Sequence, residues 1–289
     1  MEYIWLSVAC SVTVSVLLKL APRWRVDVRQ AIAGNYLVAG ALCLGLLRPR
    51  TALLWQSAGD GTWVVLLGLG VLLPGMFLVL ARSVQQAGVV RTDAAQRLSL
   101  ILPLLAAFTL FGEALTWQKG AGMLLGLLAM ACIVARRDAA RADGRASGGW
   151  PWPAIVFAGT GVIDILFKRM AQSTGMPFAD VLFATFVLAL VLASAYVLWL
   201  YLAGRARWAW RHAAFALALG GFNFGNILFY IQAHRHLASD PALVFSAMNI
   251  GVIVVATLVG TWAFGERPGR LNRLGLALAV VAVAVLATA

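Results

Sequence analysis

The chain has 289 residues, of which 62% are hydrophobic and only 12% charged, and its formal net charge is +12. This composition excludes a soluble globular domain, in which about 25% of the residues are charged. The positive charge does not indicate nucleic-acid binding, because basic residues in the short loops of a membrane protein orient its helices. The sequence therefore predicts an integral membrane protein.

Ten apolar stretches are long enough, or nearly so, to cross a bilayer core, which takes about 20 residues of helix. In chain order they lie at 3–20, 30–47, 62–82, 93–112, 118–135, 152–171, 179–203, 212–233, 241–265 and 271–288. Nearly all other residues belong to short connections, which leaves no room for a soluble domain. Charged residues inside the fourth and sixth stretches need a structural or functional reason, because charge is costly in lipid.

Two segments of the chain repeat each other. The tripeptide Phe-Gly-Glu occurs at 111–113 and again at 264–266, a separation of 153 residues, and in both copies a glycine follows nine residues after the glutamate. A second echo places Lys19 and Lys168 near the end of the first apolar stretch of each half. The chain therefore looks duplicated, and an internal repeat constrains the architecture more than any local pattern does.

Five predicted spans in each half determine how the two copies are arranged. Because five is odd, the second copy must enter the membrane from the opposite side, as in carriers with a central site. We therefore predict an all-α integral membrane protein with ten transmembrane helices in two inverted five-helix repeats. The repeats cover 1–135 and 152–289, and a hydrophilic linker joins them at 136–151.

The distribution of basic residues predicts the orientation of the helices. Fifteen of the 23 lysines and arginines lie in the loops after the first, third, fifth, seventh and ninth stretches, and six lie on the other side. Loops rich in lysine and arginine stay in the cytoplasm. We therefore expect the linker in the cytoplasm and both termini in the periplasm.

Asp164 is the clearest ionisable group inside a predicted span, about twelve residues into the sixth stretch and so near mid-membrane. Lys168 follows one helical turn later, so the two side chains can meet on one face. Two interpretations stay open. The residues form a neutralised structural pair, or Asp164 is a proton or substrate-amine site whose partner changes during a transport cycle.

Polar residues also occur at matched positions of the fourth and ninth stretches. The fourth contains Asp93, Gln96 and Arg97, and the offset of 153 residues places Ser246 and Asn249 of the ninth opposite Asp93 and Gln96. This match fits a binding site near the axis that relates the two repeats. Arg97 can hold a carboxylate or phosphate through two hydrogen bonds, and a salt bridge to an aspartate is the alternative.

The eighth stretch carries Asn223, Asn226, Tyr230 and His234 at spacings of three, four and four residues, so they share one helical face. Four polar groups facing lipid would be unfavourable, and this face is predicted to line a cavity. Hydrogen bonding between helices is the alternative. Asn35 in the second stretch is a further candidate for the same cavity.

No sequence pattern indicates an enzyme. The chain has no His-Glu-x-x-His pair, no Gly-x-Ser-x-Gly elbow and no glycine-rich phosphate loop followed by Lys-Ser or Lys-Thr. We expect no catalytic residue, no metal site and no bound cofactor. Glu113 and Glu266 lie at the ends of predicted spans and are expected to cap helices or pair with cations.

The repeated signature and the paired lysines resemble the drug/metabolite transporter (DMT) superfamily, of the EamA type, over essentially the whole chain. The likeness rests on Lys19, Lys168 and the fourth-to-fifth-span signature, which includes Pro103, Gly122 and Gly275. It implies a ten-helix carrier of two inverted repeats that usually exports metabolites such as amino acids. It also implies a central cavity lined by the first four spans of each half, with the fifth and tenth spans outside it.

Two features depart from that resemblance. Both termini are predicted outside, whereas the family is commonly described with its termini inside. The small multidrug members use a glutamate within the first span, and this chain has only Glu2 at its very start. This absence does not fit drug/proton antiport by their mechanism.

Together these observations predict a secondary transporter of the bacterial plasma (inner) membrane that exports a small metabolite, an amino acid or related solute, by alternating access. Two alternatives stay open: a flippase for a lipid-linked sugar or phospholipid, and a non-transporting membrane assembly subunit. The expected partners are the small-molecule substrate and membrane lipid, and small residues in the fifth and tenth stretches allow a homodimer. The predicted substrate-binding residues are Arg97, Gln96, Asn223, Asn226, Tyr230, Asn249 and Asn35, and the predicted coupling or proton-carrying residues are Asp164, Lys168 and Asp93.

Overall fold

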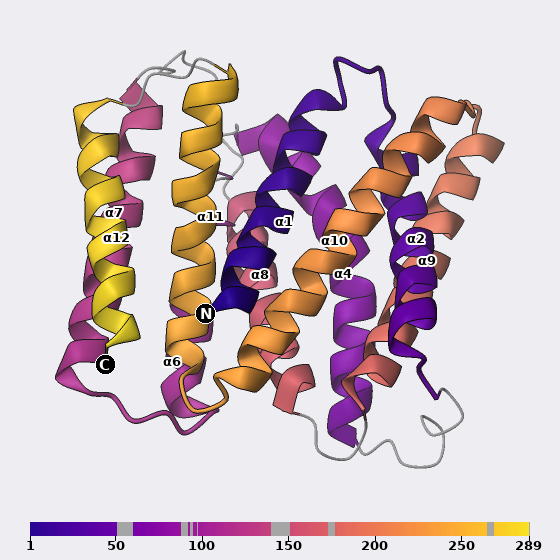
Figure 1. The fold of residues 1–289 in the computed structure, drawn as a ribbon. Helices are drawn as coiled ribbons and strands as arrows, with labels where there is room; N and C mark the ends of the chain where they lie inside the picture. Colours follow the sequence, from indigo (N-terminus) through magenta and orange to yellow (C-terminus); the bar gives the residue numbers. More distant parts are fainter. Residues whose placement is uncertain are drawn as a thin grey trace. The chain divides into compact units, whose positions relative to one another are not determined.

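The computed structural model describes residues 1–50, 60–87, 92, 95–96, 98–139, 151–172, 177–264 and 269–288. The regular secondary structure of these residues is helical (Figure 1). The helices are α1 (Glu2–Leu20), α2 (Val28–Leu47), α4 (Asp60–Ala87), α6 (Ile101–Thr109), α7 (Trp117–Ala139), α8 (Pro151–Gln172), α9 (Phe178–Leu202), α10 (Trp210–His236), α11 (Pro241–Phe264) and α12 (Arg270–Ala287).

Six helical segments among the described residues are long and apolar enough to cross a membrane. They are Glu2–Leu20, Val28–Leu47, Gly61–Leu80, Phe178–Leu202, Trp210–His236 and Pro241–Trp262. Large apolar side chains such as Leu37, Leu46 and Val191 are exposed on these helices, where lipid rather than water suits them. The chain is therefore a multi-pass membrane protein.

The other four predicted spans also coincide with helices. Helices α7, α8 and α12 cover nearly the same residues as the stretches predicted at 118–135, 152–171 and 271–288. Helix α6 lies within the stretch predicted at 93–112. None of the four is among the six segments that qualify by length and hydropathy over the described residues. The all-helical membrane fold is confirmed, and the layout of ten spans stays a prediction.

The helices form two compact units. Unit 1 comprises Met1–Gly75 and Leu166–Arg235, and unit 2 comprises Met76–Ile165 and His236–Ala289. Each unit thus combines helices from both halves of the sequence. The two repeats predicted at 1–135 and 152–289 were defined by sequence similarity, whereas these units are defined by contacts in space. The division into units therefore does not test the repeats, which stay a prediction.

In unit 1, α2 packs against α9 and α10. Tyr201 at the end of α9 donates its hydroxyl to Oε1 of Gln30 at the start of α2, over 2.6 Å. At the other end of α2, the backbone N–H of Arg50 donates to Oδ1 of Asp180, at the start of α9, also over 2.6 Å. These two contacts show that α2 and α9 run antiparallel.

The crossing of α2 and α10 depends on glycine. A Cβ atom at Gly220 would lie 2.6 Å from Cβ of Val38 and 2.8 Å from the carbonyl oxygen of Asn35. A Cβ atom at Gly34 would likewise lie 2.6 Å from Cβ of Ala216. Small residues of this kind let membrane helices approach closely enough for dense packing.

In unit 2, α7 and α12 lie side by side (Figure 1). Gly122 of α7 contacts Leu286 of α12, and Gly126 faces Ala282 one turn further along, so the two helices are antiparallel. Small residues of the fifth and tenth predicted spans therefore let α7 and α12 pack together within one chain. A homodimer stays a prediction.

Candidate functional site

Lys168 is the most deeply buried charged side chain of unit 1. It lies near the end of α8 with 0% of its surface exposed, and its Nζ donates a long hydrogen bond of 3.5 Å to the backbone carbonyl of His234. That carbonyl is among the last four of α10, where the helix dipole places negative partial charge. An ammonium group in an apolar interior must find such acceptors, because its unpaired burial would be very costly.

The residue that accepts from this amine, His234, belongs to a buried group of aromatic rings. The rings of Tyr230 and His234, one turn apart on α10, meet edge to face with centroids 4.8 Å apart. Phe167 of α8 meets Tyr230 with centroids 6.0 Å apart and ring planes at 82°. We call Phe167, Lys168, Tyr230 and His234 the Lys168 cluster; all four are buried. The cluster thus combines one buried cation with three buried aromatic side chains.

The polar face predicted on the eighth stretch points partly into unit 1. Tyr230 and His234 are buried, and Asn223 and Asn226 are half-buried. Ser7 of α1 donates its hydroxyl to the backbone carbonyl of Asn226 at 2.8 Å and lies 2.9 Å from Oδ1 of the same residue. Asn226 therefore takes part in hydrogen bonding between α1 and α10, which is the alternative to a cavity-lining role. A role in substrate binding stays a prediction for this face.

Asn35 on α2 is 1% exposed, and its Oδ1 has no hydrogen-bond partner among the described residues. Buried side-chain acceptors without a partner are rare in native proteins and mark places where a water or ligand is expected. Asp180 presents the same feature, because its Oδ2 is buried without a partner while Oδ1 binds Arg50. The sequence analysis did not identify Asp180 as a candidate site residue, because an acidic residue at the start of a helix is common.

The remaining predicted residues belong to unit 2 or to undescribed positions. Gln96 is exposed, and Asp164 on α8 is half-buried. Asn249 donates its amide to the carbonyl of Phe245 one turn earlier on α11, over 3.0 Å. The nearby hydroxyl of Ser246 is buried and has no hydrogen-bond partner in the part of the chain that the structure describes. Asp93 and Arg97 lie outside the described residues.

Glu113 forms a buried ion pair in unit 2. Its Oε1 accepts from Nζ of Lys119 at 2.8 Å, and Oε2 accepts from the backbone N–H of Ala242 at 2.8 Å, in the first turn of α11. Nζ of Lys119 also binds Oδ1 of Asp240 at 2.8 Å. The expectation that Glu113 caps a helix and pairs with a cation is confirmed. Glu266 lies outside the described residues.

The predicted residues that the structure describes divide between the two units. Unit 1 holds Asn35, Lys168, Asn223, Asn226 and Tyr230, and unit 2 holds Gln96, Asp164 and Asn249. The described residues contain no group of three His, Cys, Asp or Glu side chains that could hold a metal ion. Long apolar helices that enclose a lysine, a histidine and several amides define a multi-pass membrane protein with a polar interior.

Comparison with known proteins agrees with this class. The sequence model of the EamA-like transporter family matches residues 2–135. A protein of Haemophilus influenzae described as uncharacterized is 40% identical over 284 residues, which cover 96% of this chain and 94% of the relative. A solved crystal structure resembles the fold with a TM-score of 0.68 at 21% identity, covering 98% of this chain and 94% of the other.

The chain belongs to the EamA-like transporter family, which is part of the DMT superfamily. Members of this family are membrane transporters of small solutes rather than enzymes. The resemblance found in the sequence is thus confirmed.

Proposed function

We propose that this protein is a secondary transporter of the bacterial inner membrane that exports a small metabolite, an amino acid or related solute, by alternating access. Family membership supports the transport of a small solute. The observation that carries the proposal within the chain is the fully buried ammonium group of Lys168 at the C-terminal end of α10.

Lys168 suits the carboxylate of an amino acid. An ammonium group surrounded by side chains binds an anion more strongly than it would in water, because the local dielectric constant is low. In the proposed cycle the substrate carboxylate replaces protein acceptors around Nζ of Lys168. Asp164 lies one turn earlier on α8 and carries the compensating proton or accepts the substrate amine.

Antiparallel packing of equivalent helices supports the inverted repeats. The second and seventh predicted spans correspond to α2 and α9, and the fifth and tenth correspond to α7 and α12. Each pair runs antiparallel, as the contacts at its two ends indicate. A two-fold axis in the membrane plane brings equivalent helices together in opposite directions.

The proposal is tested by comparing extracellular metabolites from cells that overproduce the wild type, Asp164→Asn or no protein. We expect one compound class to accumulate outside only with the wild type, at equal protein levels in the membrane. Accumulation with both forms would keep the transporter and remove Asp164 from the transport step.

The two alternatives predict other outcomes. A flippase would leave soluble metabolites unchanged and alter the distribution of a lipid between the two leaflets. An assembly subunit would change neither, and its loss would lower the amount of a partner complex. Either result would contradict export of a small metabolite.

A further inference from the structure

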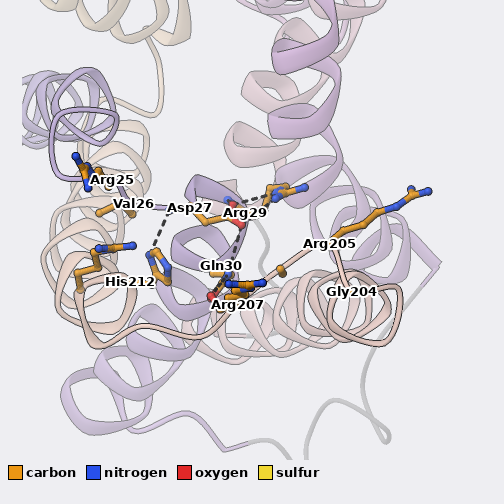
Figure 2. Close-up of a pocket in the computed structure, with 11 residues that line it drawn as sticks. Arg25, Val26, Asp27, Arg29, Gln30, Gly204, Arg205, Arg207 and His212 are labelled. Carbon is orange, nitrogen blue, oxygen red and sulfur yellow. Dashed lines mark hydrogen bonds and ion pairs between the residues drawn. The ribbon is translucent and has the colours of Figure 1, made fainter.

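A basic cavity of about 510 Å³ lies in unit 1, between the connection from α1 to α2 and the connection from α9 to α10 (Figure 2). Its lining contains five arginines, one histidine and a single acid, Asp27. The two connections are far apart in the sequence. The fold therefore gathers cationic groups that no local sequence pattern joins.

The one acid is already neutralised. Oδ1 of Asp27 accepts from the backbone N–H of Arg29 at 3.0 Å and from its Nε at 2.9 Å, and Oδ2 accepts from Nη2 of Arg29 at 2.9 Å. Burial alone would raise the pKa of the Asp27 carboxyl, but the hydrogen bonds from Arg29 and Gln30 hold that pKa below its ordinary value. Asp27 thus stays ionised at neutral pH and offsets the charge of Arg29 only.

Three of the remaining arginines line the cavity with no ion-pair partner for their guanidinium groups among the described residues. Arg205 turns its guanidinium away and places it 5.6 Å from the ring centre of Trp199 (Figure 2). Arg25, Arg207 and Arg211 are exposed and make no ion pair with the residues that the structure describes. Three uncompensated guanidinium groups around one cavity favour a phosphate, which each can bind through two hydrogen bonds.

Two helix N-termini add to this positive field. Helix α2 starts directly after Asp27 and α10 starts at Trp210, so both present the positive ends of their dipoles to the cavity. The backbone N–H of Asp27 donates to Nδ1 of His212 at 3.2 Å, which joins the two connections and requires a neutral imidazole. Gln30 also donates to the backbone carbonyl of Arg207 at 3.1 Å. The cavity is therefore held by hydrogen bonds before any ligand binds.

Arg25 occupies a backbone conformation that glycine would adopt more easily. Its φ is +52°, and it lies in the turn that follows α1. In this turn the N–H of Val26 donates to the carbonyl of Ala21, and the N–H of Arg25 donates to the carbonyl of Pro22. Helix α9 ends in the same motif, but there the left-handed residue is Gly204, with a φ of +67°. A non-glycine residue held in this region suggests that its side chain has a use that outweighs the strain.

Exposed tryptophans locate the cavity at membrane-interface depth. Trp24, Trp208 and Trp210 flank the two connections and are 51%, 62% and 80% exposed. Tryptophan is enriched where the hydrocarbon core meets the headgroups, because its ring is apolar and its N–H polar. The arginines next to these rings are therefore suited to the headgroup layer.

We propose that the basic cavity of unit 1 binds the phosphate of an anionic phospholipid headgroup, with Arg25, Arg207 and Arg211 as its ligands. Basic pockets between membrane helices on the cytoplasmic side commonly hold such headgroups. A cytoplasmic position of the cavity agrees with the orientation predicted from the loop charges. If these arginines served only to orient the helices in the membrane, positive charge in the loops would be enough. A cavity with a neutralised acid and an arginine in a left-handed backbone conformation would not be needed.

The test measures thermal unfolding of the full-length protein in a neutral detergent, with added phosphatidylglycerol, phosphatidylcholine or inorganic phosphate. We expect phosphatidylglycerol to raise the unfolding temperature and phosphatidylcholine to leave it unchanged. The double variant Arg207→Gln/Arg211→Gln should need about tenfold or more phosphatidylglycerol for the same rise, since each lost charged hydrogen bond weakens binding severalfold. Arg270→Gln/Arg273→Gln removes the same charge from exposed positions at the start of α12 and should behave as the wild type.

Arg25→Gly separates binding from folding. Glycine relieves the left-handed strain, so this variant should unfold at the wild-type temperature or above it without lipid, and still need more phosphatidylglycerol for its response. An equal loss of response in the α12 variant would show unspecific attraction and overturn the proposal. An equal rise with phosphatidylcholine would do the same. If inorganic phosphate reproduces the full rise and abolishes the lipid effect, the ligand is a soluble phosphate and the lipid assignment is wrong.

Discussion

At the residue scale, two lysines that occupy similar positions in the sequence differ in burial. Lys19 and Lys168 stand at equivalent positions of the two halves, yet Lys19 is exposed and Lys168 is fully buried. A charge at a protein surface is easily solvated, whereas a buried one needs acceptors supplied by the fold. The two lysines therefore lie in different environments, and our proposal assigns the contact with a substrate carboxylate to Lys168 alone.

A substitution at Glu113 tests whether its buried ion pair stabilises the fold. Its side chain is 1% exposed and accepts from both Lys119 and the N-terminus of α11. We expect Glu113→Gln to lower the free energy of unfolding by about 1–3 kcal/mol, because the buried Lys119 loses the more deeply buried of its two counter-charges. Thermal unfolding in detergent measures this change.

Asp240→Asn is the matched control for Glu113. The Asp240 side chain is 36% exposed, so removing its charge should cost clearly less than the change at Glu113. Equal losses in the two variants would mean that the buried position of Glu113 adds nothing to stability.

At the element scale, the crossing of α2 and α10 gives a test between neighbouring glycines. Gly220→Ala forces a methyl group to within 2.8 Å of a backbone carbonyl, whereas a Cβ atom at Gly221 would meet nothing within 4 Å. We expect Gly220→Ala to destabilise by about 1–3 kcal/mol, as overpacking typically does. Gly221→Ala should be neutral or slightly stabilising, since alanine favours a helix. Unfolding temperatures of the two variants at equal expression decide between these outcomes, and a Gly220 variant as stable as the Gly221 variant would contradict the close crossing.

The positions of the helices were predictable from sequence, but their partners were not. Apolar runs about as long as a bilayer core is thick predicted α1, α2, α9, α10 and α11 to within a few residues at most boundaries. The bond from Ser7 to Asn226 joins residues 219 positions apart, and nothing in either segment indicates the other. The basic cavity likewise requires two distant loops to meet. Glu113 was interpreted correctly because the end of a helix is a local feature.

At the scale of the whole molecule, the packing of α7 against α12 can be tested by cross-linking. A Cβ atom at Gly126 would lie 3.9 Å from Cβ of Ala282, within the range that a disulfide requires. In a background without Cys10, Cys43 and Cys132, we expect Gly126→Cys/Ala282→Cys to form a disulfide within one chain on oxidation. Cleavage at a protease site inserted into the linker at 136–151 should then leave the halves joined until a reductant is added.

A disulfide-linked dimer of intact chains would contradict this arrangement. It would show that the fifth and tenth spans pair between protomers instead. Gly126→Cys with Ala277→Cys, which is exposed on α12, serves as the control pair and should not cross-link.

The charges of the loops predict the orientation of the molecule. A reporter fused after residue 289 should behave as periplasmic, because fifteen of the 23 basic residues lie on the side of the linker. Two reporters give opposite signals. Fused alkaline phosphatase is active only when it is exported to the periplasm, whereas fused green fluorescent protein loses its fluorescence on export. A cytoplasmic signal would reverse the predicted orientation and move the basic cavity to the outer leaflet.

Transport through the Lys168 cluster is the step on which the proposed function depends most. The direct measurement uses purified protein in liposomes loaded with the compound that wild-type cells export, and follows its release into a substrate-free medium. We predict release with the wild type and with Lys19→Met, and at least a tenfold slower release with Lys168→Met, because one lost buried ion contact exceeds about 1.4 kcal/mol. Release at the wild-type rate from the Lys168→Met protein would contradict a role of Lys168 in binding the substrate.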